Sequence, residues 1–455
     1  MKAVKKHRSD MALSGRQSGD EHDELPRARR AGIESLEDRN FVVLALHQVV
    51  HRIAWVFKTE TVIIPAFLDS VAGAGWVRGC LPVLNRFGQS VPQAIFSRRL
   101  KQMPRKVWAL FGATLGMAAA MFAVAACCFA ADGERPAWMA PTFLVLYPLF
   151  FMFAGLNQLS YGTVQGKLIR PARQGRLLAV SSAIGATAAI VVAWLLLGRW
   201  LAIARGGFGY IFGFTGICFA GSALVLLGIA EPIDQDAAAE VGLREYLADS
   251  WRLLGHDGNL RRLIAVAMLF ATVLILFPHY QALARARLQL TEANLMVWVV
   301  AQNAALGGFS LLFGTLADRH GNRPALCLLL AIASLTPVLA VTLAHVDPTW
   351  GRRLFPAVFM ALGATPVIVK TLTNYTLEVS AVAEHPRYLS TLNLGLAAPF
   401  CLSPVVGLLV DLINFEAVLL AGAIVIGSGG LLSLRLVEPR SNALERKFRG
   451  KPFDR

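Results

Sequence analysis

The feature that most constrains this chain is a series of apolar runs that recurs along almost its whole length. Each run holds about 18 to 25 residues, and a helix of that length crosses the hydrocarbon core of a bilayer, which is about 30 Å thick. Of the 455 residues, 55% are hydrophobic and only 16% are charged, a balance that a water-soluble chain rarely has. The sequence therefore predicts an all-α membrane protein that crosses the bilayer many times.

Charged and Pro- or Gly-rich breaks divide the apolar runs into twelve predicted transmembrane helices. Six of them lie in the first part of the chain, at 41–67, 73–97, 107–130, 139–165, 177–198 and 208–230. Six more lie in the second part, at 262–283, 293–316, 324–345, 354–379, 388–411 and 416–437. Because the number is even, both termini are predicted on the same side of the membrane.

The predicted helices group into two six-helix halves, residues 41–230 and 262–438. The polar stretch between them, 231–261, has apolar residues at helical spacing, which are Leu243, Leu247, Trp251 and Leu254. We interpret this stretch as a cytoplasmic linker with an amphipathic helix on the inner leaflet. A solvated linker with incidental periodicity is the alternative.

Both ends of the chain are polar. Residues 1–40 are charged and lack the apolar core of a cleavable signal peptide, so we predict a disordered cytoplasmic tail that becomes helical near Ile33. Residues 439–455 are predicted to form a basic cytoplasmic tail. The membrane-embedded part of the protein should therefore run from residue 41 to residue 438.

Lys and Arg are distributed unevenly between the two sides of the predicted membrane. About 32 of the 44 lie in the tails and in the breaks on the same side, about 8 lie in the opposite breaks, and the other four lie inside predicted helices. The basic side is expected to be cytoplasmic, which places both termini in the cytoplasm and the protein in the cytoplasmic (inner) membrane. The same basic breaks explain the net charge of +15 without a nucleic-acid partner.

One break between predicted helices, residues 314–323, is unusually dense in charge: it reads GTLADRHGNR. Gly321 suits the backbone of a tight turn, and Pro324 suits the first turn of the next helix. Asp318 can accept hydrogen bonds at a helix end and pair with a neighbouring basic residue. The break is either a gating element or a turn that only sets the orientation of the chain.

This stretch resembles the G-x-L-A-D-R-x-G-x-[RK] signature of the major facilitator superfamily. Twelve helices, a central linker and two halves fit the same family, so the resemblance implies two pseudo-symmetric six-helix halves that rock around a central site. It also implies a cytoplasmic latch, whose residues are Gly314, Asp318, Arg319, Gly321 and Arg323, with Arg105 as the match of Arg323 in the first half. Leu100 and Met103 stand where the signature would place Asp and Gly, so the first half departs from the pattern.

The motifs of enzymes and metal sites are missing from the sequence. Residues 161–168 contain Gly-Lys, but Leu168 replaces the Ser or Thr that a phosphate loop needs. The six cysteines lie inside or at the ends of predicted helices and form no CxxC pair. We therefore predict no enzymatic activity, no cofactor and no metal site, and energy drawn from an ion or solute gradient.

The first predicted helix contains the most ionisable residues, and such groups are costly at membrane depth. On a helical wheel His47, His51 and Lys58 fall within an arc of about 40°, whereas Arg52 and Glu60 point elsewhere. We interpret the arc as facing an aqueous cavity, because helices 1, 4, 7 and 10 line one in the family that the motif resembles. The two histidines titrate near neutral pH and are candidates for proton coupling, with satisfied packing histidines as the alternative.

Polar residues also gather in the fourth, seventh and tenth predicted helices, and Pro278 could break the seventh as a gate. The candidate substrate-binding residues are His51, Arg52, Lys58, Gln158, Tyr161, Lys370 and Asn374. The candidate proton-coupling residues are His47, His51 and Glu60. Cations outnumber acids at membrane depth, so either an anionic substrate bound by Lys370 or an interhelical pair such as Glu60 with Arg86 must compensate them.

The sequence thus predicts a monomeric secondary active transporter that moves a small organic solute by alternating access. Its expected partners are the solute, which could be anionic, a proton or other coupling ion, and the lipid bilayer. A transporter-like sensor or lipid-handling protein without concentrative transport is the alternative. The stacked polar residues of the predicted cavity favour transport over lipid handling.

Overall fold

The computed structural model describes residues 27–134, 136–203, 207–233, 254–255, 257–290, 294–381 and 384–438. This part of the chain is built of helices and contains no strand. Eleven of its helical segments are long and apolar enough to cross a membrane. The segment α4 (Gly75–Gln102) is 28 residues long but more polar, and it brings the number to twelve, in agreement with the predicted fold class.

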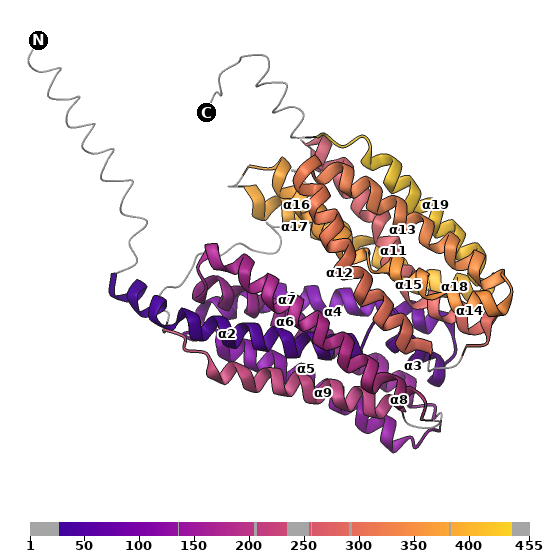
Figure 1. Cartoon of the computed structure of the whole chain (residues 1–455), viewed down its shortest axis with the longest axis horizontal. Helices are drawn as coiled ribbons and strands as arrows, with labels where there is room; N and C mark the ends of the chain where they lie inside the picture. Colours follow the sequence, from indigo (N-terminus) through magenta and orange to yellow (C-terminus); the bar gives the residue numbers. More distant parts are fainter. Residues whose placement is uncertain are drawn as a thin grey trace, which may run out of the picture.

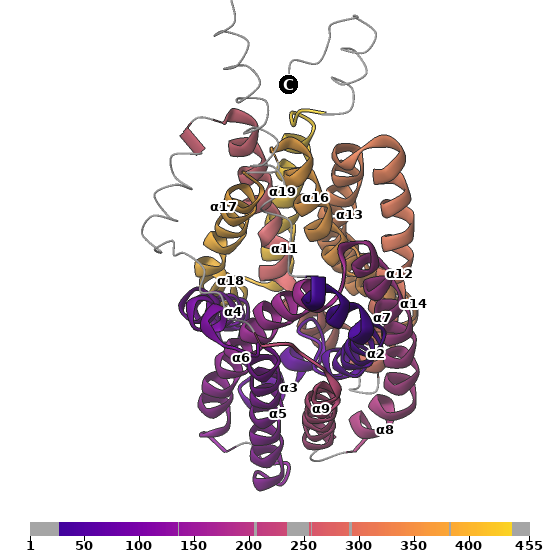
Figure 2. The same ribbon diagram turned by 90° about the vertical axis from the view of Figure 1, so that its left-hand side faces the viewer.

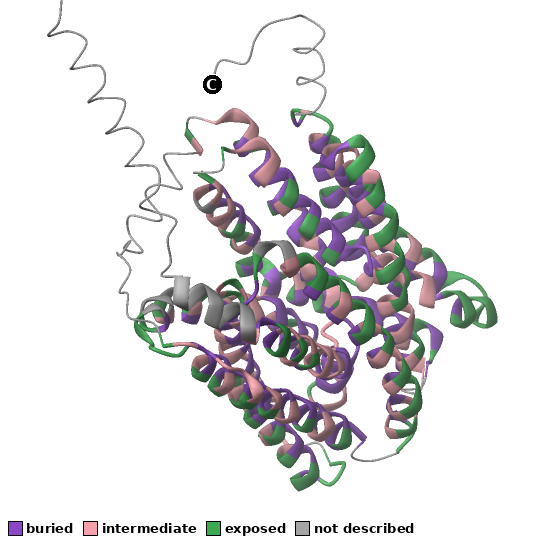
Figure 3. Cartoon of the chain, turned by 60° about the vertical axis from the view of Figure 1, so that its left-hand side comes forward, coloured by how far each residue is buried: buried purple, intermediate pink, exposed green. Residues whose placement is uncertain are grey.

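Figures 1 and 2 show the helices arranged as two bundles, one from each half of the chain. The first contains α2 (Arg27–Phe57), α3 (Ile63–Val71), α4, α5 (Val107–Ala130), α6 (Met139–Leu168), α7 (Pro171–Val192), η1 (Ala193–Leu197), α8 (Gly198–Leu201), α9 (Gly207–Val225) and η2 (Leu226–Gly228). The second contains α11 (Gly258–Leu288), α12 (Asn294–His320), α13 (Asn322–His345), α14 (Pro348–Leu354), α15 (Pro356–Leu362), α16 (Thr365–Val379), α17 (His385–Ala397), η4 (Ala398–Leu402), α18 (Ser403–Leu412) and α19 (Phe415–Ser433). Figure 3 shows buried residues gathered inside each bundle.

The first predicted helix, 41–67, is in fact two helices, which corrects the sequence prediction. α2 ends at Phe57 and α3 begins at Ile63. Between them the hydroxyl of Thr59 donates to the Val56 carbonyl, and the Thr59 carbonyl accepts from the backbone N–H groups of Ile63 (3.0 Å) and Ile64 (3.1 Å). These local bonds satisfy the backbone where the helix is interrupted, as a break at membrane depth requires.

Other elements also differ from the prediction. α2 begins at Arg27, ahead of Ile33, near which the sequence predicted the tail to become helical. Glu37 is buried within it, where it accepts from Arg170 Nε at 2.8 Å. α11 continues through Pro278 to Leu288, so the predicted break in that helix is wrong. The apolar repeat of the predicted linker helix falls mainly on residues 234–253, which lie outside the described residues, as does the predicted C-terminal tail.

The two halves meet on the side of the molecule away from the chain ends, which we call the far side. The opposite side, where α2 begins and α19 ends, is the terminal side. Gly79 of α4 lies against the second half so closely that an added Cβ would stand 2.6 Å from the Ser403 carbonyl oxygen, and Gly407 of α18 packs on Gly75. The bundles diverge toward the terminal side (Figure 1), so the structure is closed on the far side.

On the terminal side, an acidic residue follows the last helix of each half. Glu231 accepts from the backbone N–H groups of Lys106 (2.9 Å) and Val107 (2.7 Å) at the start of α5, and from Lys167 Nζ (2.7 Å). In the second half Glu438 lies at the turn before α13, where a Cβ added to Gly321 would stand 2.6 Å from Glu438 Oε1. Gly321 has φ +99°, which confirms the predicted need for glycine at this turn.

Replacing Glu231 with Gln should destabilise the first half, because the amide keeps one acceptor oxygen but loses the charge that faces Lys167 and two helix N–H groups. We expect a loss of about 2 kcal/mol in unfolding free energy, measured by denaturant titration of the protein in detergent. Glu384→Gln, at an exposed position before α17, is the matched control and should change little. Equal stability of the two variants would contradict this role for Glu231.

Candidate functional site

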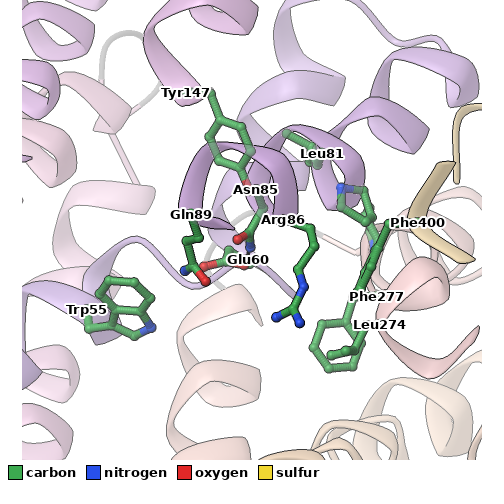
Figure 4. A pocket seen from close by; sticks show the side chains of 12 residues that line it. Trp55, Glu60, Leu81, Asn85, Arg86, Gln89, Tyr147, Leu274, Phe277 and Phe400 are labelled. Carbon is green, nitrogen blue, oxygen red and sulfur yellow. Dashed lines mark hydrogen bonds between the residues drawn. The ribbon is translucent and has the colours of Figure 1, made fainter. Parts of the chain in front are cut away.

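A cavity of about 270 Å³ lies between the two halves (Figure 4). The first half contributes Trp55, Glu60, Leu81, Pro82, Asn85, Arg86, Gln89 and Tyr147 to its lining, and the second contributes Leu274, Phe277, Pro278 and Phe400. Because both halves form its walls, a relative movement of the halves would change its access to either side of the membrane.

The break in the first transmembrane helix shapes this cavity. Because α2 stops at Phe57, the chain turns and places Glu60 in the cavity wall. Figure 4 shows the carboxylate of Glu60 beside the amides of Asn85 and Gln89, and the Asn85 amide donates to Glu60 Oε2. Of the described lining residues, Glu60 is the only acid and Arg86 the only base.

Lys58 lies behind the cavity wall and carries a second positive charge. Its side chain is 1% exposed, and its Nζ stands 2.7 Å from Glu60 Oε1. The ammonium also lies over the ring of Trp55, 3.5 Å from its centroid, and near the rings of Phe151 (4.4 Å) and Phe150 (4.8 Å). A carboxylate and three aromatic faces thus compensate a cation that would otherwise be costly at this depth.

Further polar contacts connect the halves around the cavity. Arg86 of α4 donates to the Asn393 carbonyl (2.9 Å) on α17. The Thr61 hydroxyl, next to Glu60 in the chain, donates to Gln302 Oε1 of α12 at 2.6 Å. The broken segment that holds Glu60 is therefore bonded directly to the second half.

Two carboxylates, Asp69 and Asp411, link the halves on the far side. Together with the close contact of Gly75, Gly79 and Gly407 they form what we call the far-side seal. Asp69 of α3 pairs with Arg78 and accepts from Gln281 Nε2 of α11 at 2.6 Å. Asp411 of α18 accepts from the backbone N–H groups of Gly75 (2.8 Å) and Trp76 (3.0 Å) at the start of α4. Each carboxylate therefore links one half to the other.

Replacing Asp411 with Ala should open the far-side seal, because it removes two charge-assisted bonds between the halves. Hydrogen bonds to charged groups are worth about 1.5 to 3 kcal/mol, so the population open on the far side should rise about tenfold or more. The measurement is the labelling rate of Leu81→Cys, in a background without native cysteines, by an impermeant maleimide on the far side.

The matched control for this prediction is Asp347→Ala. Asp347 lies on the same side but caps α14 within its own half, where it accepts from the Thr349 N–H at 2.9 Å. Its removal should leave the labelling rate unchanged. If both variants label at the wild-type rate, Asp411 does not hold the halves together.

His47 and His51, which were predicted to face the cavity, lie outside its lining in this structure. His47 is fully buried in the first half, where its Nδ1 lies 2.9 Å from Ser222 Oγ and its ring stacks on Tyr161. His51 packs edge-on against Phe219 of α9, with the ring centroids 5.0 Å apart. The helical wheel gave the angle between these side chains correctly, but tertiary packing turned that face toward α9.

Arg52 and Glu60, which the helical wheel placed away from the arc of His47, His51 and Lys58, lie at the interface between the two halves. Arg52 Nη2 donates to Asn303 Oδ1 of α12 at 3.3 Å, and Glu60 lines the cavity. Lys58 is buried behind the cavity wall and is not part of the lining.

Four other predicted substrate-binding residues lie outside the cavity lining. Gln158 is exposed and accepts from Gln93 Nε2 at 3.3 Å, and Tyr161 stacks on His47. Lys370 and Asn374 are exposed one turn apart on α16. The contribution of Lys370 and Asn374 to binding stays a prediction.

The predicted gating residues gather on the terminal side. Gly314, Asp318 and Arg319 belong to the last turns of α12, with Asp318 and Arg319 exposed. Arg323 at the start of α13 donates to the Leu434 carbonyl, which ties this turn to the end of α19. Arg105 is exposed in the corresponding turn of the first half. Their role as a latch stays a prediction.

Sequence reasoning missed most of the cavity. It did not select Asn85 and Gln89, or the rings of Trp55, Tyr147 and Phe277. A signal for the amides was available, because Asn85, Arg86 and Gln89 interrupt an otherwise apolar span at helical spacing. The aromatic residues carry no such signal in a chain this rich in them.

The second half of the chain matches a known family. The sequence profile of the Major Facilitator Superfamily covers residues 281–454, a range that includes the 314–323 stretch. This match confirms the resemblance on which the sequence prediction rested. No curated protein sequence matches the chain.

Solved structures of transporters share the fold over most of the chain. A mutant of the nucleoside transporter NupG has a TM-score of 0.69 at 12% identity, covering 88% of this chain and 100% of its own. A bacterial homologue of the human lysosomal transporter Spinster, inward-facing and unoccupied, has a TM-score of 0.63 at 11% identity, covering 92% and 99%. A bacterial homologue of the iron transporter ferroportin, also inward-facing, has a TM-score of 0.63 at 13% identity, covering 88% and 98%.

Proposed function

We propose that this chain, a Major Facilitator Superfamily protein by its second half and of transporter fold throughout, is a secondary active transporter of a small organic solute. The observation that carries the proposal is the cavity between the halves, with one carboxylate, Glu60, on a broken segment of the first transmembrane helix. Broken helices at the interface of structural repeats are where such transporters bind solutes and coupling ions.

The contacts between the two halves are consistent with an alternating-access mechanism. The far-side seal closes the cavity on one side, and the halves diverge on the other. If the halves rocked about the cavity, the far-side contacts would break and the terminal ends would close. The predicted latch around Asp318 would then hold the closed terminal side.

We take the proton as the coupling ion and Glu60 as its carrier. Glu60 lines the cavity and is held by Lys58 and Asn85, whereas neither histidine candidate lines it and His47 is buried in the first half. Protonating Glu60 would remove the charge that faces the Lys58 ammonium and so change the electrostatics of the cavity wall. A proton can therefore bias the same element that contacts the solute.

The predicted orientation puts the terminal side in the cytoplasm, because the basic residues gather there. Reporter fusions test it directly. A fusion at Asp318 or after Arg440 should report a cytoplasmic location, and fusions near Glu134 and Asp347 an external one. The reverse result at either pair would overturn the orientation.

The test of transport is uptake of a radiolabelled metabolite panel into proteoliposomes, with and without an imposed pH gradient. The panel includes a nucleoside, since a nucleoside transporter shares the fold. We expect saturable uptake of at least one solute, accelerated by an inward proton gradient. Uptake equal to that of empty liposomes for every solute would count against transport, and uptake indifferent to the gradient would count against proton coupling.

A further inference from the structure

The polar and apolar parts of the cavity lining come from different halves of the protein. All four charged or amide side chains, Glu60, Asn85, Arg86 and Gln89, belong to the first half. The described lining of the second half is wholly apolar and consists of Leu274, Phe277, Pro278 and Phe400. Figure 4 shows the polar side chains together, with Phe277 and Phe400 beside the guanidinium of Arg86.

We infer that the solute is a small organic monoanion with a compact apolar body, about the size of one ring. This inference rests on the proposed transport function. The negative group binds at Arg86 beside the amides of Asn85 and Gln89, and the apolar body packs against Phe277 and Phe400. Each half thus binds a different end of the solute.

The sign of the charge on the solute's polar group follows from the charged side chains at the cavity. Arg86 lines it and Lys58 stands directly behind it, against a single acid, Glu60, so the formal sum is one positive charge. A cationic solute would add a further like charge at membrane depth, whereas an anion offsets one of the positive charges. The planar guanidinium of Arg86 also suits a carboxylate geometrically.

The size of the solute follows from the volume of the cavity. At about 270 Å³ it lies just below the range of about 300 to 1,000 Å³ that is usual for drug-sized ligands. Two aromatic rings and a leucine on one wall favour a flat or branched hydrocarbon body over a sugar. A carboxylate on a single ring meets both requirements.

The position of Glu60 links this anion to the proton. An ionised Glu60 stands near the Arg86 end of the cavity, as Figure 4 shows, and repels an anion bound there. Protonating Glu60 removes that repulsion, so proton and anion each raise the affinity for the other. The anion should therefore bind more tightly as the pH falls.

The experiment measures equilibrium binding of radiolabelled benzoate to the full-length protein in detergent. The competitors are benzamide, which lacks the charge, benzylamine, which reverses it, and acetate, which lacks the ring. We expect saturable benzoate binding in the millimolar range or tighter, with each competitor at least tenfold weaker than unlabelled benzoate. The affinity of the wild type for benzoate should rise as the pH falls. The affinity of Glu60→Gln should not depend on pH in this way.

Variants locate the site. Arg86→Gln should weaken benzoate binding at least tenfold and leave the affinity for uncharged benzamide unchanged, while Arg86→Lys should lose less. Phe277→Ala should weaken benzoate more than acetate. Arg199→Gln, which removes an exposed cation on α8 away from the cavity, is the control and should bind normally. A thermal unfolding curve for each variant separates lost binding from lost folding.

Three results would overturn the inference: no saturable benzoate binding, benzylamine binding more tightly than benzoate, or loss of binding in Lys370→Gln with none in Arg86→Gln. Loss of binding in Lys370→Gln alone would assign the binding of the anion to Lys370 on α16. Because binding in detergent needs no transport, these outcomes differ from failure of the proposed function. Benzoate that binds as described but is never taken up would refute transport alone.

Discussion

Glu60→Gln is expected to abolish accumulation driven by a pH gradient. The amide keeps an acceptor for Lys58 but cannot release a proton, so solute movement no longer carries one. One unit of pH supplies about 1.4 kcal/mol per proton, which corresponds to roughly tenfold accumulation of a solute that moves with one proton. The variant should fall from that ratio to none in proteoliposomes with an imposed pH gradient.

Exchange of labelled for unlabelled solute provides the control for this variant. Exchange needs no net proton movement, so it should persist in Glu60→Gln while net accumulation is lost. His51→Gln should keep both activities, because His51 packs against Phe219 of α9 and does not line the cavity. Normal gradient-driven accumulation by Glu60→Gln would exclude Glu60 as the proton carrier.

Glu60→Ala should cause the largest loss of stability among single changes at the cavity. It leaves the Lys58 ammonium, 1% exposed and among aromatic rings, without its carboxylate. Removing one partner of a buried ion pair costs about 3 to 5 kcal/mol. Unfolding of the protein in detergent, followed by denaturant titration, measures the loss.

The double variant Lys58→Met/Glu60→Ala tests the cause. Methionine fills a similar volume beside Trp55 and carries no charge, so the double variant should recover most of the stability that Glu60→Ala loses. The coupling energy of the cycle then reports the interaction between the two side chains. Additive losses in the double variant would show that the ammonium does not depend on Glu60.

Local sequence signals predicted the elements of the fold well. Apolar runs identified the spans, because a helix must hide its backbone polar groups over the full width of the hydrocarbon core. The 314–323 stretch indicated a family resemblance, and the profile of that family matches the second half of the chain. In the structure Gly321 has φ +99°, which other residues resist, and Arg323 bonds to the end of the last helix. Each of these signals lies within one short segment of the chain.

The interruption of the first transmembrane helix could not be predicted in the same way. Residues 58–62 are polar and β-branched, but the apolar residues on both sides read as one span of helical length. The break is stable because of partners far along the chain: Asn85 donates to Glu60, and Thr61 donates to Gln302. Without those partners the same residues would expose unsatisfied polar groups at membrane depth.

The sequence by itself determined that this chain crosses a membrane about twelve times in two related halves, because helix length and hydropathy are local properties. Only the tertiary structure decided which residues form the cavity. Trp55, Glu60, Arg86 and Phe400 lie up to several hundred residues apart, and a helical wheel gives the angles between side chains without saying which neighbour each one faces. The packing of α2 against α9 placed His47 beside Ser222 and His51 against Phe219, outside the cavity lining. The contact between the halves closed the cavity that Glu60 and Arg86 line.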